Sequence, residues 1–192
     1  MPIQYVNRKG DTYFLHESKT KTGKPNWFFS KKAEGKLAES IPDGYEIYQN
    51  PKAQVFLRTI VPTLVTQEEI GTVERGVRTF ARLPYFLVEG KCKSITVFIA
   101  DQETGFLEDT LVSKFGIANR EKMAAVMQRH LSYLPHMRFT LVDQEARRFA
   151  VERWCFRGSI DDWIHLWGSG DLATMVEKYA PHLGKESFFE LF

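Results

Sequence analysis

Residues 59–70 read TIVPTLVTQEEI, and the character of the chain changes within this stretch. Before it, short runs of aromatic and β-branched residues alternate with turn residues, a pattern typical of β-strands. After it, Thr66 and Glu69 have the spacing of a capping box, in which an N-cap hydroxyl precedes a carboxylate by three positions. We therefore expect a β-rich region to end here and a region of mixed helices and strands to begin.

The length and composition of the chain are those of a folded protein. It has 192 residues, of which 43% are hydrophobic and 26% charged, and this balance excludes disordered and low-complexity classes. We divide it into a small basic β-rich region, residues 1–60, and an α+β region, residues 61–192. The two regions form either separate domains or one continuous domain.

The first region reads as a β-meander followed by a hairpin. Glycine-containing turns around Gly10 and Gly23 separate the first three strands. The pattern then predicts a short helix at residues 34–40, and Asn50-Pro51 marks the turn of a hairpin. The expected strands are residues 3–8, 12–20, 26–32, 45–48 and 55–58.

The second region reads as helices that alternate with hairpins. Because no βαβ alternation is visible, we expect an antiparallel sheet with its helices packed on one face, and hence an α+β fold. Met127 and Leu131 are expected on the buried face of the second helix, which Pro135 ends. A third helix is expected to start at Ser159, with Trp163 and Trp167 on its apolar stripe. The expected helices are residues 66–83, 119–134, 159–167 and 171–179, and the expected hairpins are 86–100 and 137–156.

Several classes of protein are excluded by what the sequence lacks. The 26 basic and 24 acidic residues give a net charge of +2, without the overall basic character of a histone-like DNA binder. No apolar run approaches the roughly 18 residues of a membrane span, and the N-terminus has no secretory signal. Cys92 and Cys155 form no disulfide framework. We expect a cytoplasmic protein that does not enter membranes; the sequence predicts no particular oligomeric state.

The most informative feature is a basic cluster in the first region. Residues 1–36 contain eight basic and three acidic side chains, a net charge of +5. Lysines on a meander beside aromatic rings suit phosphate contact with base stacking, and a three-stranded sheet with a following helix can also enter a major groove. A lysine-rich sheet edge that prevents aggregation is the alternative interpretation. The candidate anion-binding residues are Lys19, Lys21, Lys24, Trp27, Lys31 and Lys32.

A second class of function is a metal-dependent hydrolase or nuclease. Glu89 and Lys91 have the acid-x-lysine spacing with which such enzymes hold a metal ion and an activated water, and Asp101 is a candidate second carboxylate. The preceding segment supplies no acidic partner. A polar β-turn beside a strand-end aspartate explains the same residues without catalysis.

Three further patterns have simpler structural interpretations. GSGDLA at residues 168–173 matches a dinucleotide fingerprint, but its glycines are expected to follow a helix, with Asp171 capping the next one. Asp161 and His165 share a helical face as a possible ligand pair. The apolar C-terminus, with Phe188, Leu191 and Phe192, is expected to fold back on its own chain.

Taken together, these patterns favour a binding module over an enzyme. We expect a non-enzymatic cytoplasmic protein without cofactor or metal, whose N-terminal meander contacts an anionic partner. That partner is either a nucleic acid or an acidic protein surface. The metal-dependent hydrolase that uses Glu89, Lys91 and Asp101 is the alternative.

Overall fold

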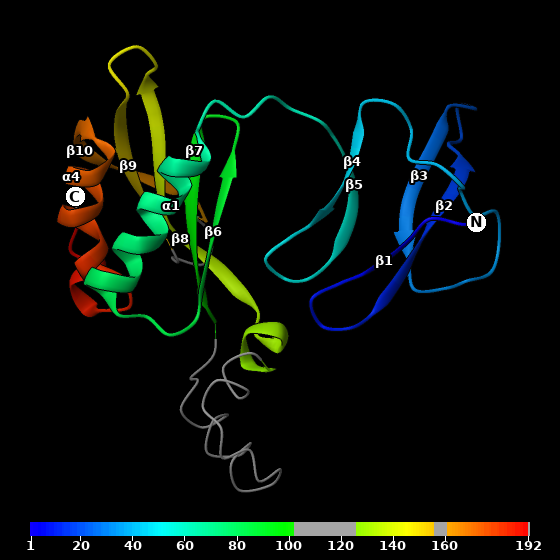
Figure 1. The fold of residues 1–192 in the computed structure, drawn as a ribbon, viewed down its shortest axis with the longest axis horizontal. Helices are drawn as coiled ribbons and strands as arrows, with labels where there is room; N and C mark the ends of the chain where they lie inside the picture. The colour runs from blue at the N-terminus through cyan, green and yellow to red at the C-terminus, as the bar shows by residue number, and fades with distance from the viewer. Residues whose placement is uncertain (102–125, 156–160, 192) are drawn as a thin grey trace, which may run out of the picture. The chain divides into compact units, whose positions relative to one another are not determined.

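The computed structural model describes residues 1–101, 126–155 and 161–191. They form two compact units (Figure 1). The first unit contains residues 1–60 and 126–132, and the second contains the remaining described residues. All strand pairs are antiparallel and helices accompany them, so the expected α+β class with an N-terminal meander and hairpin is confirmed.

The first unit begins with the predicted three-stranded meander. Gly10 and Gly23, with φ of 87° and 79°, form its two turns in the left-handed backbone region that glycine adopts without steric cost. The fully buried Leu15 lies opposite Phe29 across the second strand pair. The strands, in sheet order, are β1 (Gln4–Val6), β2 (Thr12–Lys19) and β3 (Pro25–Ser30).

The helix expected at residues 34–40 does not form, and this prediction is wrong. The segment instead runs along the edge of β2 beyond the short β1, with an isolated bridge between Leu37 and His16. The Ala38 amide donates to the Leu15 carbonyl at 2.8 Å. Backbone groups of β2 that β1 is too short to reach are thereby satisfied, a tertiary demand that outweighs a weak local helix preference.

The remainder of the first unit is a hairpin and a helical turn. The predicted hairpin is confirmed as β4 (Tyr45–Gln49) and β5 (Val55–Thr59). Residues 126–130 are helical, and Met127 and Leu131 are both buried as predicted. The Leu131 carbonyl accepts a hydrogen bond from the Arg8 guanidinium at 3.0 Å, which ties this late segment to the N-terminal strands.

The second unit is built on a five-stranded antiparallel sheet in which each strand pairs with its neighbours in sequence. Buried residues alternate along these strands, so one face of the sheet is apolar. The strands are β6 (Phe86–Lys91), β7 (Ser94–Ala100), β8 (Tyr133–Asp143), β9 (Arg148–Trp154) and β10 (Trp163–Asp171).

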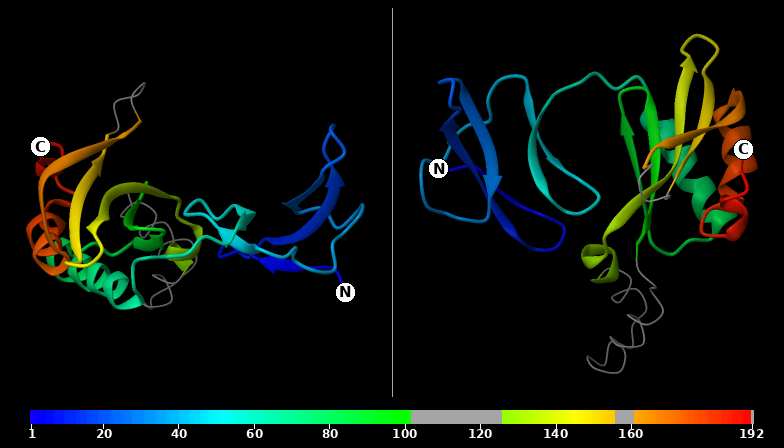
Figure 2. Two further views of the ribbon diagram at one scale, coloured as in Figure 1. Left: turned by 90° about the horizontal axis from the view of Figure 1, so that it is seen from above. Right: turned by 180° about the vertical axis from the view of Figure 1, so that it is seen from behind.

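Helices cover the apolar face of this sheet (Figure 2). The first is α1 (Gln67–Gly76), which continues into the π-helical turn η1 (Val77–Ala81). It begins at the predicted capping box: Thr66 accepts from the Glu69 amide, and the Glu69 carboxylate accepts from the Thr66 amide. The second is α4 (Leu172–Tyr179), which Asp171 caps as predicted.

The two helices approach each other closely at Gly76. A Cβ atom at this position would overlap the side chain of Val176 on α4. The absence of a side chain at Gly76 therefore sets the distance between α1 and α4, and both residues are buried.

The helix expected from Ser159 to Trp167 is wrong for the residues that the structure describes. Residues 163–171 form the edge strand β10; Ser159 lies outside the described residues. Leu166 points into the core, whereas His165 lies opposite Glu152 on the other face. A short apolar run fits both helical and strand periods, and here pairing with β9 decides between them.

The second predicted helix is too long at its C-terminal end. Helical structure stops at residue 130, and Pro135 lies inside β8 instead of ending a helix. The proline is accommodated at a β-bulge, where the register with β7 shifts between Val97 and Phe98. The predicted start of this helix, residues 119–125, lies outside the described residues.

The C-terminal segment folds back on the second unit as predicted. It contains the short 3₁₀ turns η2 (Ala180–His182) and η3 (Glu186–Phe188). Phe188 is 1% exposed and belongs to the core, and the Arg153 Nε donates to the Leu191 carbonyl at 2.8 Å. Phe192 lies outside the described residues.

Candidate functional site

The turn between β2 and β3 presents three of the predicted lysines. The Thr20 amide donates to the Lys24 carbonyl at 2.8 Å, and the Lys24 amide donates to the Thr20 hydroxyl at 3.1 Å. These bonds close the turn and leave its side chains exposed to solvent. We call Lys19, Lys21 and Lys24 the basic turn; among the residues that the structure describes, they form no ion pair.

Two other lysines of the first unit are already paired. Lys31 Nζ lies 2.9 Å from Asp11, and Lys36 Nζ lies 3.0 Å from Glu17. The hydrogen bond from Lys31 lowers the pKa of the Asp11 carboxyl, and the same bond raises the pKa of Lys31. Lys31 is therefore partly neutralised, unlike the basic turn, while Lys32 is exposed at the end of β3.

The aromatic residues of β3 point to opposite faces of the meander. Trp27 is half-buried, and its ring packs against Tyr45 of β4 at a centroid distance of 6.2 Å. Phe28 is 44% exposed and lies flat against His16, with ring centroids 5.1 Å apart and an interplanar angle of 10°. Sequence reasoning placed Trp27 in the candidate site and left Phe28 out, but Phe28 is the more exposed ring.

The candidate hydrolase residues are not brought together. Glu89 lies on β6 opposite Thr96 of β7, and Asp101 follows the end of β7 five residues later. Five residues of extended strand span about 16 Å, so Asp101 lies about that far along the strand direction from Thr96 and from Glu89 opposite it. Lys91 is exposed at the end of β6. Within residues 1–101, 126–155 and 161–191, no cluster of three His, Cys, Asp or Glu side chains is arranged to bind a metal ion.

A row of polar side chains crosses the open face of the five-stranded sheet, and sequence reasoning did not find it. Strand register places one residue of each strand in line. Arg138 donates to both carboxylate oxygens of Glu152 at 2.7 and 2.9 Å, and its guanidinium lies over the Trp163 ring at 4.3 Å. The row consists of Glu89, Thr96, Arg138, Glu152 and His165.

The central acid of this row is held as a carboxylate. Partial burial raises the pKa of Glu152, but hydrogen bonds from Arg138 and from the Thr140 hydroxyl outweigh it, and the pKa lies below its usual value. A carboxylate with a lowered pKa is a poor proton acceptor. The row is therefore best explained as a cross-strand ion pair that stabilises the sheet.

The dinucleotide and metal-pair interpretations lose their structural basis. The glycines of residues 168–173 do not follow a helix; they lie within β10, the antiparallel edge strand of the sheet. The Asp171 carboxylate accepts from the Thr174 amide at the N-terminus of α4, where a pyrophosphate would bind. Asp161 precedes β10 and does not share a helical face with His165, so that pairing was wrong.

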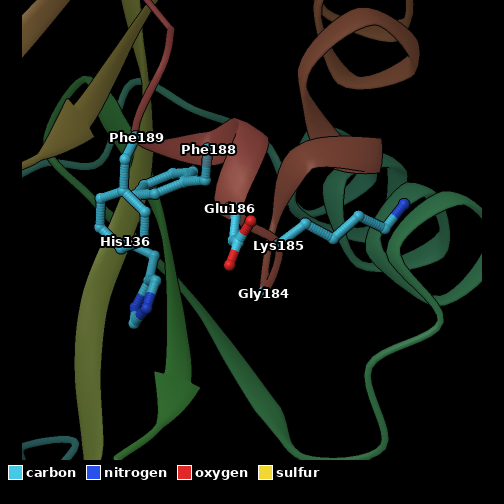
Figure 3. Close-up of a pocket in the computed structure, with 6 residues that line it drawn as sticks. All are labelled: His136, Gly184, Lys185, Glu186, Phe188 and Phe189. Carbon is cyan, nitrogen blue, oxygen red and sulfur yellow. The ribbon is translucent and has the colours of Figure 1, made fainter.

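A cavity of about 320 Å³ lies between β8 and the C-terminal segment (Figure 3). It is lined by His136, Phe188 and Phe189 together with Gly184, Lys185 and Glu186. Figure 3 shows the Lys185 side chain extending away from His136, so the charged and polar groups do not converge on one point. The cavity marks the packing of the C-terminal segment on the bulge of β8.

Comparisons with protein-family models, with curated proteins and with solved structures give no match. Among the described residues, no helix has the length and apolar character needed to span a bilayer. Because no related protein guides the choice, the basic turn is selected as the candidate site from the geometry of this chain alone.

Proposed function

We propose that this protein is a non-enzymatic binding module that contacts an anionic partner through the basic turn. The observation that carries the proposal is the contrast between paired and unpaired lysines. Lys31 and Lys36 are neutralised by Asp11 and Glu17, whereas Lys19, Lys21 and Lys24 project from a turn with no acidic partner among the described residues.

Charge density supports this proposal. Three ammonium groups within six residues repel one another, and an approaching polyanion relieves that repulsion while releasing its own counterions. The partner is a nucleic acid or an acidic protein surface. A cytosolic location belongs to the same proposal, because Cys92 and Cys155 are free thiols, as is usual in a reducing compartment.

The test is binding of two polyanions, single-stranded DNA and poly-glutamate, across salt concentrations from about 50 to about 200 mM. The triple variant Lys19→Gln, Lys21→Gln, Lys24→Gln is expected to fold normally, because solvated lysines contribute little to stability. It should bind more weakly, and for single-stranded DNA the slope of log K against log salt should flatten by about 2, since each contact contributes about 0.7.

A matched control removes the same charge from other places in the first unit. The variant Lys9→Gln, Lys36→Gln, Lys52→Gln should retain most of the affinity and the salt slope of the unmodified protein. Equal losses in the two triple variants would show a diffuse charge effect and contradict a specific site. Absence of binding to both polyanions would also contradict the proposal.

A further inference from the structure

The ring of Phe28 is held as a flat platform. One of its faces lies against the imidazole of His16, at 5.1 Å between centroids and with the planes 10° from parallel. His16 is itself buried, and its Nε2 lies 2.9 Å from the Lys32 carbonyl. A ring that is seated on a fixed neighbour and remains 44% exposed presents apolar surface at little cost in side-chain entropy.

The platform lies on β3, four residues after Lys24, the last lysine of the basic turn. Side chains two residues apart on a strand point the same way, so Asn26 and Phe28 lie about 7 Å apart on one face, whereas Lys19, opposite Pro25, lies on the other face. Across from them, the Ser18 hydroxyl accepts from the Asn26 amide at 3.1 Å. An exposed aromatic ring and an exposed carboxamide thus share one face of β3, and the exposed Lys24 precedes them in the turn.

From this arrangement we infer that the anionic partner is a single-stranded nucleic acid, whose phosphates contact the basic turn and one of whose bases stacks on Phe28. This inference rests on the proposed function and specifies its ligand. In a duplex the flat faces of the bases are covered by their neighbours, whereas single strands offer them to aromatic side chains. Carboxylates of an acidic protein would engage the lysines and gain nothing from the ring.

The test separates the bases from the phosphates. Fluorescence anisotropy would compare the full-length protein bound to a thymidine oligonucleotide of about twelve residues with an abasic oligonucleotide of the same length. The thymidine strand should bind at least about fivefold more tightly, because stacking on an aromatic residue strengthens binding by at least that factor. Equal affinity for the two strands would overturn the inference while leaving the proposed function intact.

Variants of Phe28 provide a second, independent measurement. Phe28→Leu should lose most of the preference for the thymidine strand, whereas Phe28→Tyr, which keeps the ring, should retain it. Phe56 on β5 is also 44% exposed, and Phe56→Leu is the matched control that should leave the preference unchanged. Circular dichroism would show that each variant is folded; retention of the full preference by folded Phe28→Leu would overturn the inference.

If the basic-turn triple variant loses affinity for both strands equally, the proposed function holds, and the comparison of strands decides the role of Phe28. If neither strand binds to the unmodified protein, the inference fails, and the proposed function fails with it only if poly-glutamate does not bind either. The two failures are distinguished by the abasic strand, which tests phosphate contact alone.

Discussion

Arg147 binds both carboxylate oxygens of Glu69, with Nη2 2.6 Å from each, although 78 residues separate the two in the sequence. The same carboxylate accepts from the Thr66 amide at 2.8 Å. This ion pair therefore joins the turn after β8 to the N-terminus of α1. Partial burial raises the pKa of Glu69, but the bonds from Arg147 and Thr66 outweigh it and hold the pKa below its usual value of 4.5.

The first prediction concerns this carboxylate. A group with a lowered pKa in the folded state stabilises the protein above its unfolded pKa, and the stabilisation disappears as the pH falls below about 4.5. Glu69→Gln should lower the free energy of unfolding by about 1–3 kcal/mol at neutral pH. When the pH is then lowered, the free energy of unfolding should decrease less in this variant than in the unmodified protein.

Urea titrations at several pH values would check this, with Glu68→Gln as the control. Glu68 lies in the same helical turn but is exposed. Identical acid sensitivity in the two variants would show that Glu69 contributes nothing specific.

The second prediction concerns His136. Burial lowers the pKa of its imidazole below 6.5, and this effect exceeds the opposing influences of the Leu134 carbonyl and of Asp101. Because the folded state favours the neutral ring, stability is fully present above pH 6.5 and is lost as the pH falls below it. His136→Phe keeps a ring beside Phe188 and removes the titration.

Free energies of unfolding at about pH 7.5 and about pH 5.5 would therefore differ less in His136→Phe than in the unmodified protein. The exposed His165 provides the comparison, and His165→Phe should retain the pH dependence. A His136→Phe protein that is as acid-sensitive as its parent would contradict the role of burial.

The third prediction tests the contact between the two helices. Alanine is ordinarily about 1 kcal/mol better than glycine inside a helix. Gly76→Ala should nevertheless destabilise the protein, because its Cβ would overlap Val176, whereas Gly71→Ala meets only the flexible end of Arg75. Overpacking of this kind costs about 1–3 kcal/mol.

Thermal melting would compare Gly76→Ala, Gly71→Ala and the double variant Gly76→Ala, Val176→Ala. We expect the melting temperature of the double variant to fall by less than the sum of the two single-variant decreases, because the smaller side chain at position 176 makes room for the new methyl group. If the decreases in melting temperature are strictly additive, positions 76 and 176 do not constrain each other, and the prediction is wrong.

The fourth prediction concerns the C-terminal segment. Phe188 is 1% exposed in the core of the second unit, whereas its neighbour Phe189 is 54% exposed. Phe188→Ala should lower the free energy of unfolding by about 3–5 kcal/mol, and Phe189→Ala should cost far less. Denaturant midpoints measure both; similar values for the two would show that the segment does not hold the core together.

Local signals were sufficient for much of this fold. The capping box at Thr66, the N-cap at Asp171 and the glycine turns at Gly10 and Gly23 each depend on residues within a few positions, and all are present. The identity of β10 was not predictable in the same way. Its apolar residues fit two periods, and only the backbone of β9, which is distant in space until the sheet forms, selects the extended one.

Only part of the candidate site was predictable, because some of its features are local and others depend on strands that are distant in the sequence. The exposure of lysines in a glycine turn is a local property, and Lys19, Lys21 and Lys24 are exposed as expected. Which of the adjacent Trp27 and Phe28 is covered depends on Tyr45, which belongs to another strand pair. The row from Glu89 to His165 depends on the register of four strand pairs and on a bulge, none of which a single sequence specifies.

The participation of residues 126–132 in the first unit has a consequence for protein synthesis. Domains generally fold in the order in which they leave the ribosome, at about 5–20 residues per second. Here the strands of residues 1–60 emerge early, but Leu131, which is buried with them and accepts from Arg8, follows some seventy residues later. The N-terminal unit is thus completed several seconds after its own strands have been translated, and a nascent chain stopped at residue 60 would leave Arg8 without the Leu131 carbonyl that it binds in the finished protein.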